Sequence, residues 1–255
     1  MDDISVHILI LLISFGFLAA FVDSVVGGGG IISVPALLLT GLPLPVVLGT
    51  NKLASSMSSF TSTITFARSG KINFRFVACL IPFSFLGAVL GAYMVRHVPA
   101  SFLKPLVIFL LIGVTVYTLL KKDWGKISTF SGITKKRHIF SMLTAFVIGF
   151  YDGFFGPGTG SFLIFAFLFL GYDFVTAAGN AKALNFTSNV ASLMTFIVLG
   201  SVSYVHGIVM GAAMIAGAWV GSRLAIRKGS SYIRPLFIAI TVILIGKQLW
   251  DLSCS

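Results

Sequence analysis

Two glycine-rich stretches, each preceded by an aspartate, interrupt an otherwise apolar chain. The first reads DSVVGGGGIISVP from Asp23 to Pro35, and the second reads DGFFGPGTGSFL from Asp152 to Leu163. Glycine lets a ligand approach the backbone closely, and free N–H groups at the start of the short helix after each run favour an anion. The alternative is that the glycines only permit tight helix crossing. In the binding interpretation, the backbone groups belong to Gly27, Gly28, Gly29, Gly30, Gly156, Pro157, Gly158, Thr159 and Gly160.

A second pattern places polar residues on one face of the helix that follows each break. In NKLASSMSSFTST and NAKALNFTSN, polar positions recur at helical spacing around Lys52 and Lys182. A lysine inside a membrane segment costs about 2.5–3.5 kcal/mol on insertion scales, which makes it a candidate functional residue. The alternative is that the lysines snorkel to the interface and the hydroxyls join helices. The binding interpretation names Asn51, Lys52, Ser55, Ser56, Ser59, Asn180, Lys182, Asn185, Ser188 and Asn189.

The two aspartates beside the breaks are the third candidate feature. The chain has no glutamate and only seven aspartates, yet Asp23 and Asp152 occupy equivalent points in the two stretches. Burial in a low dielectric favours the neutral form of a carboxyl group, so either residue could couple transport to protons. The alternative is a structural role, in which the carboxylate caps the following turn or pairs with a lysine.

The composition indicates that these groups lie in a membrane. Hydrophobic residues make up 57% of the 255 residues and charged residues 10%, whereas soluble domains carry about 25% charged residues. Apolar runs of about 20 residues recur along the chain, as expected for a polytopic protein in a lipid bilayer. The first run, 4–22, follows MDD rather than a basic segment, which favours a retained helix over a cleaved signal. We assign the net charge of +11 to cytoplasmic loops rather than to nucleic-acid binding.

The chain contains an internal repeat. Aligning Asp152 with Asp23 also aligns Gly158 with Gly29, and after one inserted residue the same alignment places Lys182 on Lys52. We therefore expect a first repeat at 1–120, a basic cytoplasmic linker at 121–138 and a second repeat at 139–255.

The distribution of basic residues predicts that the two repeats have opposite orientations. With an odd number of crossings in each half, 13 basic residues lie inside and two lie outside, whereas an even number gives nine and six. The positive-inside rule favours the first arrangement, which places both termini outside. The expected apolar segments are 4–24, 28–41, 45–67, 74–95 and 102–120, with counterparts at 139–153, 157–171, 174–198, 203–226 and 232–250.

The second segment of each set is too short to cross a bilayer about 30 Å thick. We therefore predict an all-α polytopic membrane protein built from two homologous inverted repeats with broken or re-entrant helices and about 8–10 transmembrane segments. Such repeats are typical of secondary transporters, whose binding site lies near the midplane where the breaks meet.

Other chemistry finds little support. The two cysteines, Cys79 and Cys254, have no metal-binding or redox spacing, and no serine–histidine or HExxH arrangement occurs. We expect no enzymatic activity, no cofactor and no metal site.

The paired motifs resemble those of the TauE/SafE family of membrane permeases. The resemblance rests on GGGG with VPALLL, GTNKLASS, GFFGPGTGSFL and GNAKALNFTSN, and it covers nearly the whole chain. It implies transport of sulfur-containing anions such as sulfite or organosulfonates, with family motifs at Gly27 to Gly30, Pro35, Asn51, Lys52, Gly156 to Gly160, Asn180 and Lys182.

The sequence thus predicts a gradient-driven transporter of small anions in the cytoplasmic (inner) membrane, with H⁺ as the expected coupling ion and a homo-oligomer as a possible assembly. Two alternatives are a passive anion channel and a structural or biogenesis protein that moves nothing.

Overall fold

The structure is a computed structural model, and it describes residues 5–95, 125, 127–130, 132, 134–233, 235–239, 242 and 246. Within these residues there is no β-strand, which confirms the all-α fold class. The helices with defined bounds are α1 (Val6–Val26), α2 (Gly30–Leu38), α3 (Leu44–Arg68), α4 (Phe74–Met94), α6 (Lys135–Phe154), α7 (Thr159–Phe169), α8 (Phe174–Val198) and α9 (Tyr204–Lys228).

Each helix overlaps one of the expected apolar segments, but α6 begins at Lys135, within the stretch expected as the linker, rather than at 139. The segment expected at 102–120 lies outside the described residues, and of the segment at 232–250 only 232, 233, 235–239, 242 and 246 are described. The expected number of 8–10 transmembrane segments stays a prediction.

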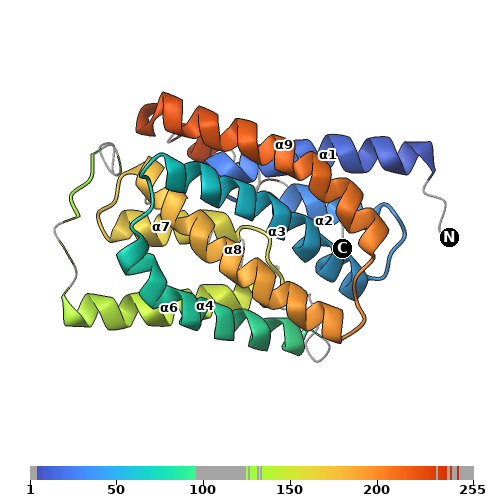
Figure 1. Ribbon diagram of the computed structural model, residues 1–255, viewed down its shortest axis with the longest axis horizontal. Helices are drawn as coiled ribbons and strands as arrows, with labels where there is room; N and C mark the ends of the chain where they lie inside the picture. The colour runs from blue at the N-terminus through green and yellow to red at the C-terminus, as the bar shows by residue number, and fades with distance from the viewer. Residues whose placement is uncertain are drawn as a thin grey trace.

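The helices form two series that match element by element. The alignment that places Asp152 on Asp23 also places the start of α6, Lys135, on the start of α1, Val6. Past the inserted residue, the start of α8 falls on the start of α3 in the same way. The first helix of each series packs against the fourth helix of the other, so that α1 lies on α9 and α6 lies on α4 (Figure 1). Two-fold exchange of this kind is compatible with inverted repeats, whose orientation in the bilayer stays a prediction.

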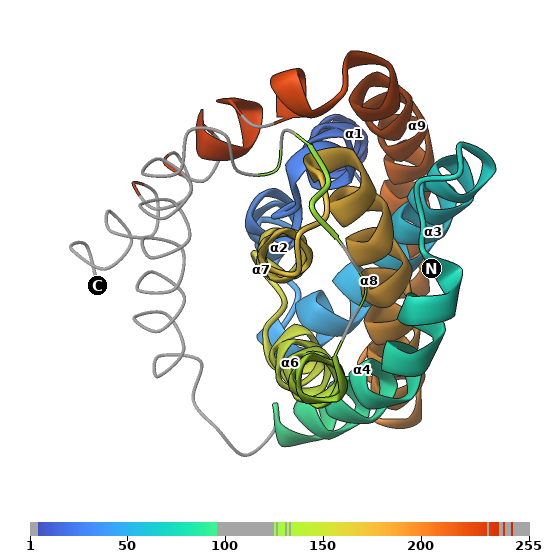
Figure 2. The ribbon, with the colours of Figure 1, turned by 90° about the vertical axis from the view of Figure 1, so that its left-hand side faces the viewer.

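The bundle is apolar on its outside and polar in its middle. By length and composition, α1, α4 and α9 can each cross a membrane. α3 and α8 have 25 residues each, or about 37 Å of helix, and they bury their polar stripes inside the bundle. Viewed end-on in Figure 2, α8 lies among α3, α4, α6 and α7, and it packs against all four.

Glycines in left-handed conformations cause the two breaks. Gly27 and Gly28 have φ angles of 78° and 88°, and Gly156 and Gly158 have φ angles of 94° and 91°. Residues that carry a side chain rarely adopt a positive φ, which explains why these positions are glycine. Because the glycines belong to the breaks, α2 has only nine residues and α7 eleven, fewer than the segments expected at 28–41 and 157–171. Neither helix can cross a bilayer about 30 Å thick.

Small residues also allow the outer helices to pack closely. A Cβ atom built on Gly217 of α9 would lie 2.2 Å from the carbonyl oxygen of Phe17 in α1, and one on Gly87 of α4 would lie 2.2 Å from that of Phe146 in α6. The backbones therefore touch where each first helix crosses the fourth helix of the other series.

We predict that Gly217→Leu destabilises the protein by at least about 1–3 kcal/mol, because the new side chain must push α9 away from α1. The adjacent Ala216 is exposed on the outer face of α9, so Ala216→Leu serves as the matched control and should leave the melting temperature of the purified protein unchanged. Equal melting temperatures for the two variants would contradict the described α1–α9 contact.

Candidate functional site

Two ion pairs, one buried and one partly buried, connect the two helix series at the centre of the bundle. Lys52 Nζ of α3 lies 2.8 Å from Asp152 Oδ1 of α6. Lys182 Nζ of α8 lies 2.6 Å from Asp23 Oδ2 of α1. The lysine of each half is therefore neutralised by the aspartate of the other half, and both aspartates lie in the last turn of the helix that precedes a break.

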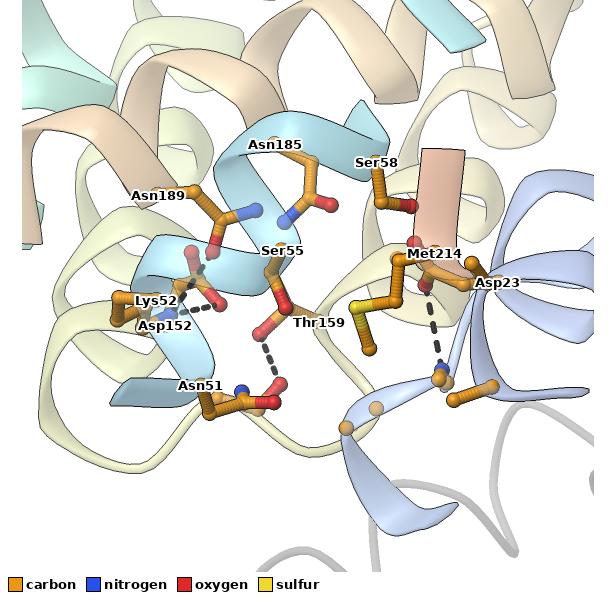
Figure 3. Close-up of a pocket in the computed structure, with 18 residues that line it drawn as sticks. Asp23, Asn51, Lys52, Ser55, Ser58, Asp152, Thr159, Asn185, Asn189 and Met214 are labelled. Atoms are coloured by element: carbon orange, nitrogen blue, oxygen red, sulfur yellow. Dashed lines mark hydrogen bonds and ion pairs between the residues drawn. The ribbon is translucent and has the colours of Figure 1, made fainter. Parts of the chain in front are cut away.

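Further hydrogen bonds hold the Lys52–Asp152 pair. Lys52 Nζ also donates to Asn189 Oδ1 at 3.2 Å, as Figure 3 shows, and Asn189 Nδ2 donates to Ser59 Oγ at 3.4 Å. Ser188 Oγ donates to Asp152 Oδ2 at 2.6 Å. Both side chains of the pair are 3% exposed, so this pair is shielded from solvent and both oxygens of Asp152 have a partner.

The second pair has a different environment. Asp23 Oδ1 accepts a hydrogen bond from the Gly29 N–H at 3.2 Å (Figure 3), and the side chain of Asp23 is 18% exposed, whereas that of Lys182 is fully buried. Ser58 is the repeat counterpart of Ser188, but its buried hydroxyl has no hydrogen-bond partner within the described residues. Equivalent groups in the two halves are therefore in different states: the Ser–Asp hydrogen bond is made in one half and absent in the other.

The two breaks meet beside these pairs. Ser161 Oγ donates to the Val26 carbonyl at 3.0 Å, and a Cβ atom on Gly27 would lie 2.3 Å from the carbonyl carbon of Gly160. Alanine at position 27 would therefore separate the breaks as well as strain the backbone. The structure confirms the expectation that the two interruptions come together.

A small cavity lies at this meeting point. About 20 Å³ is open to the centre of a water-sized sphere, which is room for about one water molecule. Within the described part of the chain, the backbone N–H groups of Gly28, Gly30, Gly158 and Gly160 have no hydrogen-bond partner. All four of these residues line the cavity, so unpaired backbone donors surround it.

Most of the residues singled out in the sequence line this cavity. They are Asp23, Gly28, Gly29, Gly30, Asn51, Lys52, Ser55, Asp152, Gly156, Gly158, Thr159, Gly160, Asn185 and Asn189. Lys182 and Ser188 lie behind it, in contact with the two aspartates. Ser59 touches Asn189, and Gly27 and Pro157 pack where the breaks meet.

Two of the expected residues serve the protein's own structure here. Ser56 Oγ donates to the Lys52 carbonyl within α3. Asn180 Oδ1 accepts from the Asn73 N–H at 2.8 Å, which ties α8 to the start of α4. The Asn180 amide nitrogen has no partner among the described residues.

Ser58 and Met214 line the cavity but were not expected there. Ser58 lies seven residues after Asn51 and three after Ser55, so helical periodicity places it on the same face and could have identified it. Met214 carries no polar group, and nothing in the sequence of α9 distinguishes it from a packing residue.

The charges at the site balance when all four groups are ionised. Two ammonium groups face two carboxylates, so the attraction for an anion that the lysines alone would exert is cancelled in this conformation. The remaining positive potential comes from the N–H groups at the starts of α2 and α7. No group of three metal-binding side chains occurs among the described residues.

The fold and the site define a multi-pass helical membrane protein in which interrupted helices meet around buried charges. The chain belongs to the TauE/SafE family, since the model described as "Sulfite exporter TauE/SafE" matches residues 12–247.

Relatives that match the chain over nearly their full length are named as transporters. A "Probable membrane transporter protein ORF9" of Sinorhizobium is 40% identical over 98% of this chain and 96% of its own length. A "Probable membrane transporter protein" of Haemophilus influenzae is 35% identical over 98% and 97%. The Escherichia coli protein "Probable membrane transporter protein YfcA" is 35% identical over 97% and 92%. No solved structure was found to match the chain.

Breaking the Lys52–Asp152 pair should cost more than removing it. We predict that Asp152→Leu lowers the free energy of unfolding by about 3–5 kcal/mol, because it leaves a buried ammonium without a partner. The double variant Lys52→Met/Asp152→Leu should recover most of this loss, since it leaves neither charge of this pair buried without its partner. Thermal unfolding of the purified variants measures both effects, and a double variant no more stable than the single one would contradict the pairing.

Proposed function

We propose that the protein is a secondary active transporter of small anions, with sulfur oxyanions or organosulfonates such as sulfite, sulfoacetate or taurine-like compounds as its substrates. The main support for this proposal is the pair of buried lysines, each in contact with the aspartate of the other half. They lie where the two glycine breaks meet and where backbone N–H groups are unpaired. The match to a sulfite-exporter family supports the choice of sulfur compounds.

An anion fits the donors around the cavity. Ammonium groups, unpaired backbone N–H groups and side-chain amides and hydroxyls all donate hydrogen bonds, and an oxyanion accepts them. The Thr159 hydroxyl donates its one hydrogen to the Gly156 carbonyl at 2.7 Å (Figure 3), so it would have to turn before it could bind an anion. The amides of Asn185 and Asn189 reach the same cavity from α8.

The balanced charges suggest how protons couple to the anion. Protonation of an aspartate removes the partner of one lysine, and a buried unpaired ammonium is costly. An anion that binds this lysine restores the balance. An anion that arrives without the proton would instead meet a carboxylate of like charge. Proton and anion are therefore stable in the site together, and each alone is disfavoured.

Asp23 is the better candidate for accepting the proton in the conformation described. Its side chain is 18% exposed, against 3% for Asp152. The charged and polar groups that face Asp23 are the Lys182 ammonium of α8 and the Gly29 N–H. Asp152 is instead enclosed by Lys52 of α3 and Ser188 of α8.

In the conformation described, the cavity is too small for the proposed substrates. Space for about one water molecule excludes a sulfonate, so the two halves must separate before a substrate enters. The unequal hydrogen bonding of Ser58 and Ser188 suggests the form of this motion. We propose that in the opposite-facing conformation Ser58 donates to Asp23, while Ser188 releases Asp152.

We further propose that the protein lies in the cytoplasmic membrane with both termini outside, as the distribution of basic residues indicates. A homo-oligomer stays a prediction of the sequence.

Reconstituted liposomes provide the main test. We expect wild-type protein to carry at least one of sulfite, sulfate, sulfoacetate and taurine, with uptake accelerated by an inward proton gradient. Lys52→Ala and Lys182→Ala should each lower the rate at least about tenfold, since each removes a charged hydrogen bond worth about 1.5–3 kcal/mol. Lys135→Gln, at the exposed start of α6, is the charge-matched control and should keep the wild-type rate.

The same assay separates the alternatives. Flux that is equal with and without the proton gradient, and unchanged in Asp23→Asn and Asp152→Asn, would identify a passive channel. No flux of any of the four compounds would contradict the proposed substrate class.

Ser58 and Ser188 should affect stability and transport differently. Ser188→Ala removes a hydrogen bond to a buried carboxylate and should lower stability by about 1.5–3 kcal/mol. Ser58→Ala removes no hydrogen bond made in this conformation and should leave the melting temperature unchanged. Both variants should slow transport, because each hydrogen bond is needed in one of the two conformations. A Ser58→Ala protein with the wild-type rate would contradict the exchange.

A further inference from the structure

A basic groove lies on the outer side of the bundle, between the C-terminal halves of α3 and α9. These helix ends lie side by side in Figure 2, and α3 packs against α9. The groove has a volume of about 610 Å³ open to the centre of a water-sized sphere. Its lining includes Phe60, Thr65, Arg68, Trp219, Arg223 and Arg227. None of these residues lines the central cavity, which other residues of α3 line.

Three arginines gather here without acidic partners. Arg68, Arg223 and Arg227 are exposed, and none forms an ion pair with a carboxylate in the part of the chain that the structure describes. The guanidinium of Arg223 lies 4.1 Å from the centre of the Trp219 ring, and stacking of this kind fixes its orientation. Arg68 and Arg227 lie in the last turns of their helices, where the helix dipole favours a positive charge. The helix dipole explains a basic residue at each helix end, but it does not explain why the arginines of two helices line one groove.

An apolar surface continues from the arginines along the same two helices. Phe60 is 50% exposed, Trp219 47% and Ile215 39%. A phosphate group that contacts the arginines would thus be attached to something apolar that covers these side chains. A phospholipid has both parts, whereas a free oxyanion has only the first. The basic ends of α3 and α9 also lie on the predicted cytoplasmic side, where anionic headgroups attract Lys and Arg.

The other half of the molecule offers an internal comparison. The helices equivalent to α3 and α9 are α8 and α4, and they also pack together. In the alignment that places Lys182 on Lys52, Arg68 corresponds to Val198 and Arg223 to Tyr93. Packing between these helices therefore does not require arginine at either of these two positions.

We propose that this groove binds an anionic phospholipid. Arg68, Arg223 and Arg227 contact the phosphate of the headgroup, and Trp219 and Phe60 pack against the acyl chains. The inference does not depend on which compound the protein transports.

The test is lipid binding to the purified protein by native mass spectrometry, with equal amounts of dioleoylphosphatidylglycerol and dioleoylphosphatidylcholine. We expect wild-type protein to prefer the anionic lipid at least about tenfold. Each arginine near a membrane surface is worth about 1 kcal/mol, or about fivefold in affinity. The variant Arg68→Gln/Arg223→Gln/Arg227→Gln should therefore bind phosphatidylglycerol about a hundredfold more weakly, and Arg223→Gln alone about fivefold more weakly.

The matched control removes the same charge elsewhere. Arg75→Gln/Lys135→Gln/Arg137→Gln changes three exposed residues at the starts of α4 and α6, and its lipid affinity should stay within about twofold of the wild type. An equal loss in the control would show non-specific attraction and overturn the proposal. Unchanged binding in the groove variants, or displacement of the lipid by millimolar inorganic phosphate, would also overturn it. The single variant Arg223→Gln keeps the test decisive if the triple variant does not fold.

Discussion

Two lysines and two aspartates lie within the centre of a bundle that is otherwise built for lipid, and each lysine is neutralised by the aspartate of the other half. A charge at this depth is costly unless it is paired, so the positions of α1, α3, α6 and α8 are constrained together. The glycine breaks follow from the same requirement. They end α1 and α6 one turn after the aspartates, and they let the two interruptions approach until their backbones touch. The polar stripes of α3 and α8 then complete the inside of the bundle.

On the proposed function, balanced charge would let one site admit an anion and yet resist leakage. With both aspartates ionised, the lysines offer an anion little net attraction. With one aspartate neutral, the lysine that has lost its partner needs an anion to balance its charge. On the proposed function, specificity for an anion is therefore a property of one protonation state rather than of the residues as such. Tight enclosure of the Lys52–Asp152 pair and partial exposure of Asp23 would then make the two halves unequal at any moment.

Much of this fold follows from the sequence. Apolar runs separated by glycine predict the helices of both halves, and the internal repeat relates the two glycine breaks to each other. The lysines and aspartates are recognisable because ionisable residues are rare in such segments. Which lysine pairs with which aspartate is not recognisable, because spacing within one half says nothing about contacts with the other half. Lys52 contacts Asp152, although Asp23 is closer to it in the sequence. Likewise, helical periodicity places Ser58 on the face of α3 that lines the cavity. That its hydroxyl has no hydrogen-bond partner among the described residues follows only from the packing of the other helices around it.

The exchange of partners between halves has a consequence for how the protein is made. When the first four helices have entered the membrane, Lys52 and Asp23 are both present, but the groups that neutralise them in the finished molecule have not yet been synthesised. The two ion pairs of the finished structure can therefore form only after α6 and α8 have been synthesised. Synthesis and membrane insertion of the second half would then be the event that locks the first half in place, rather than an addition to a finished module.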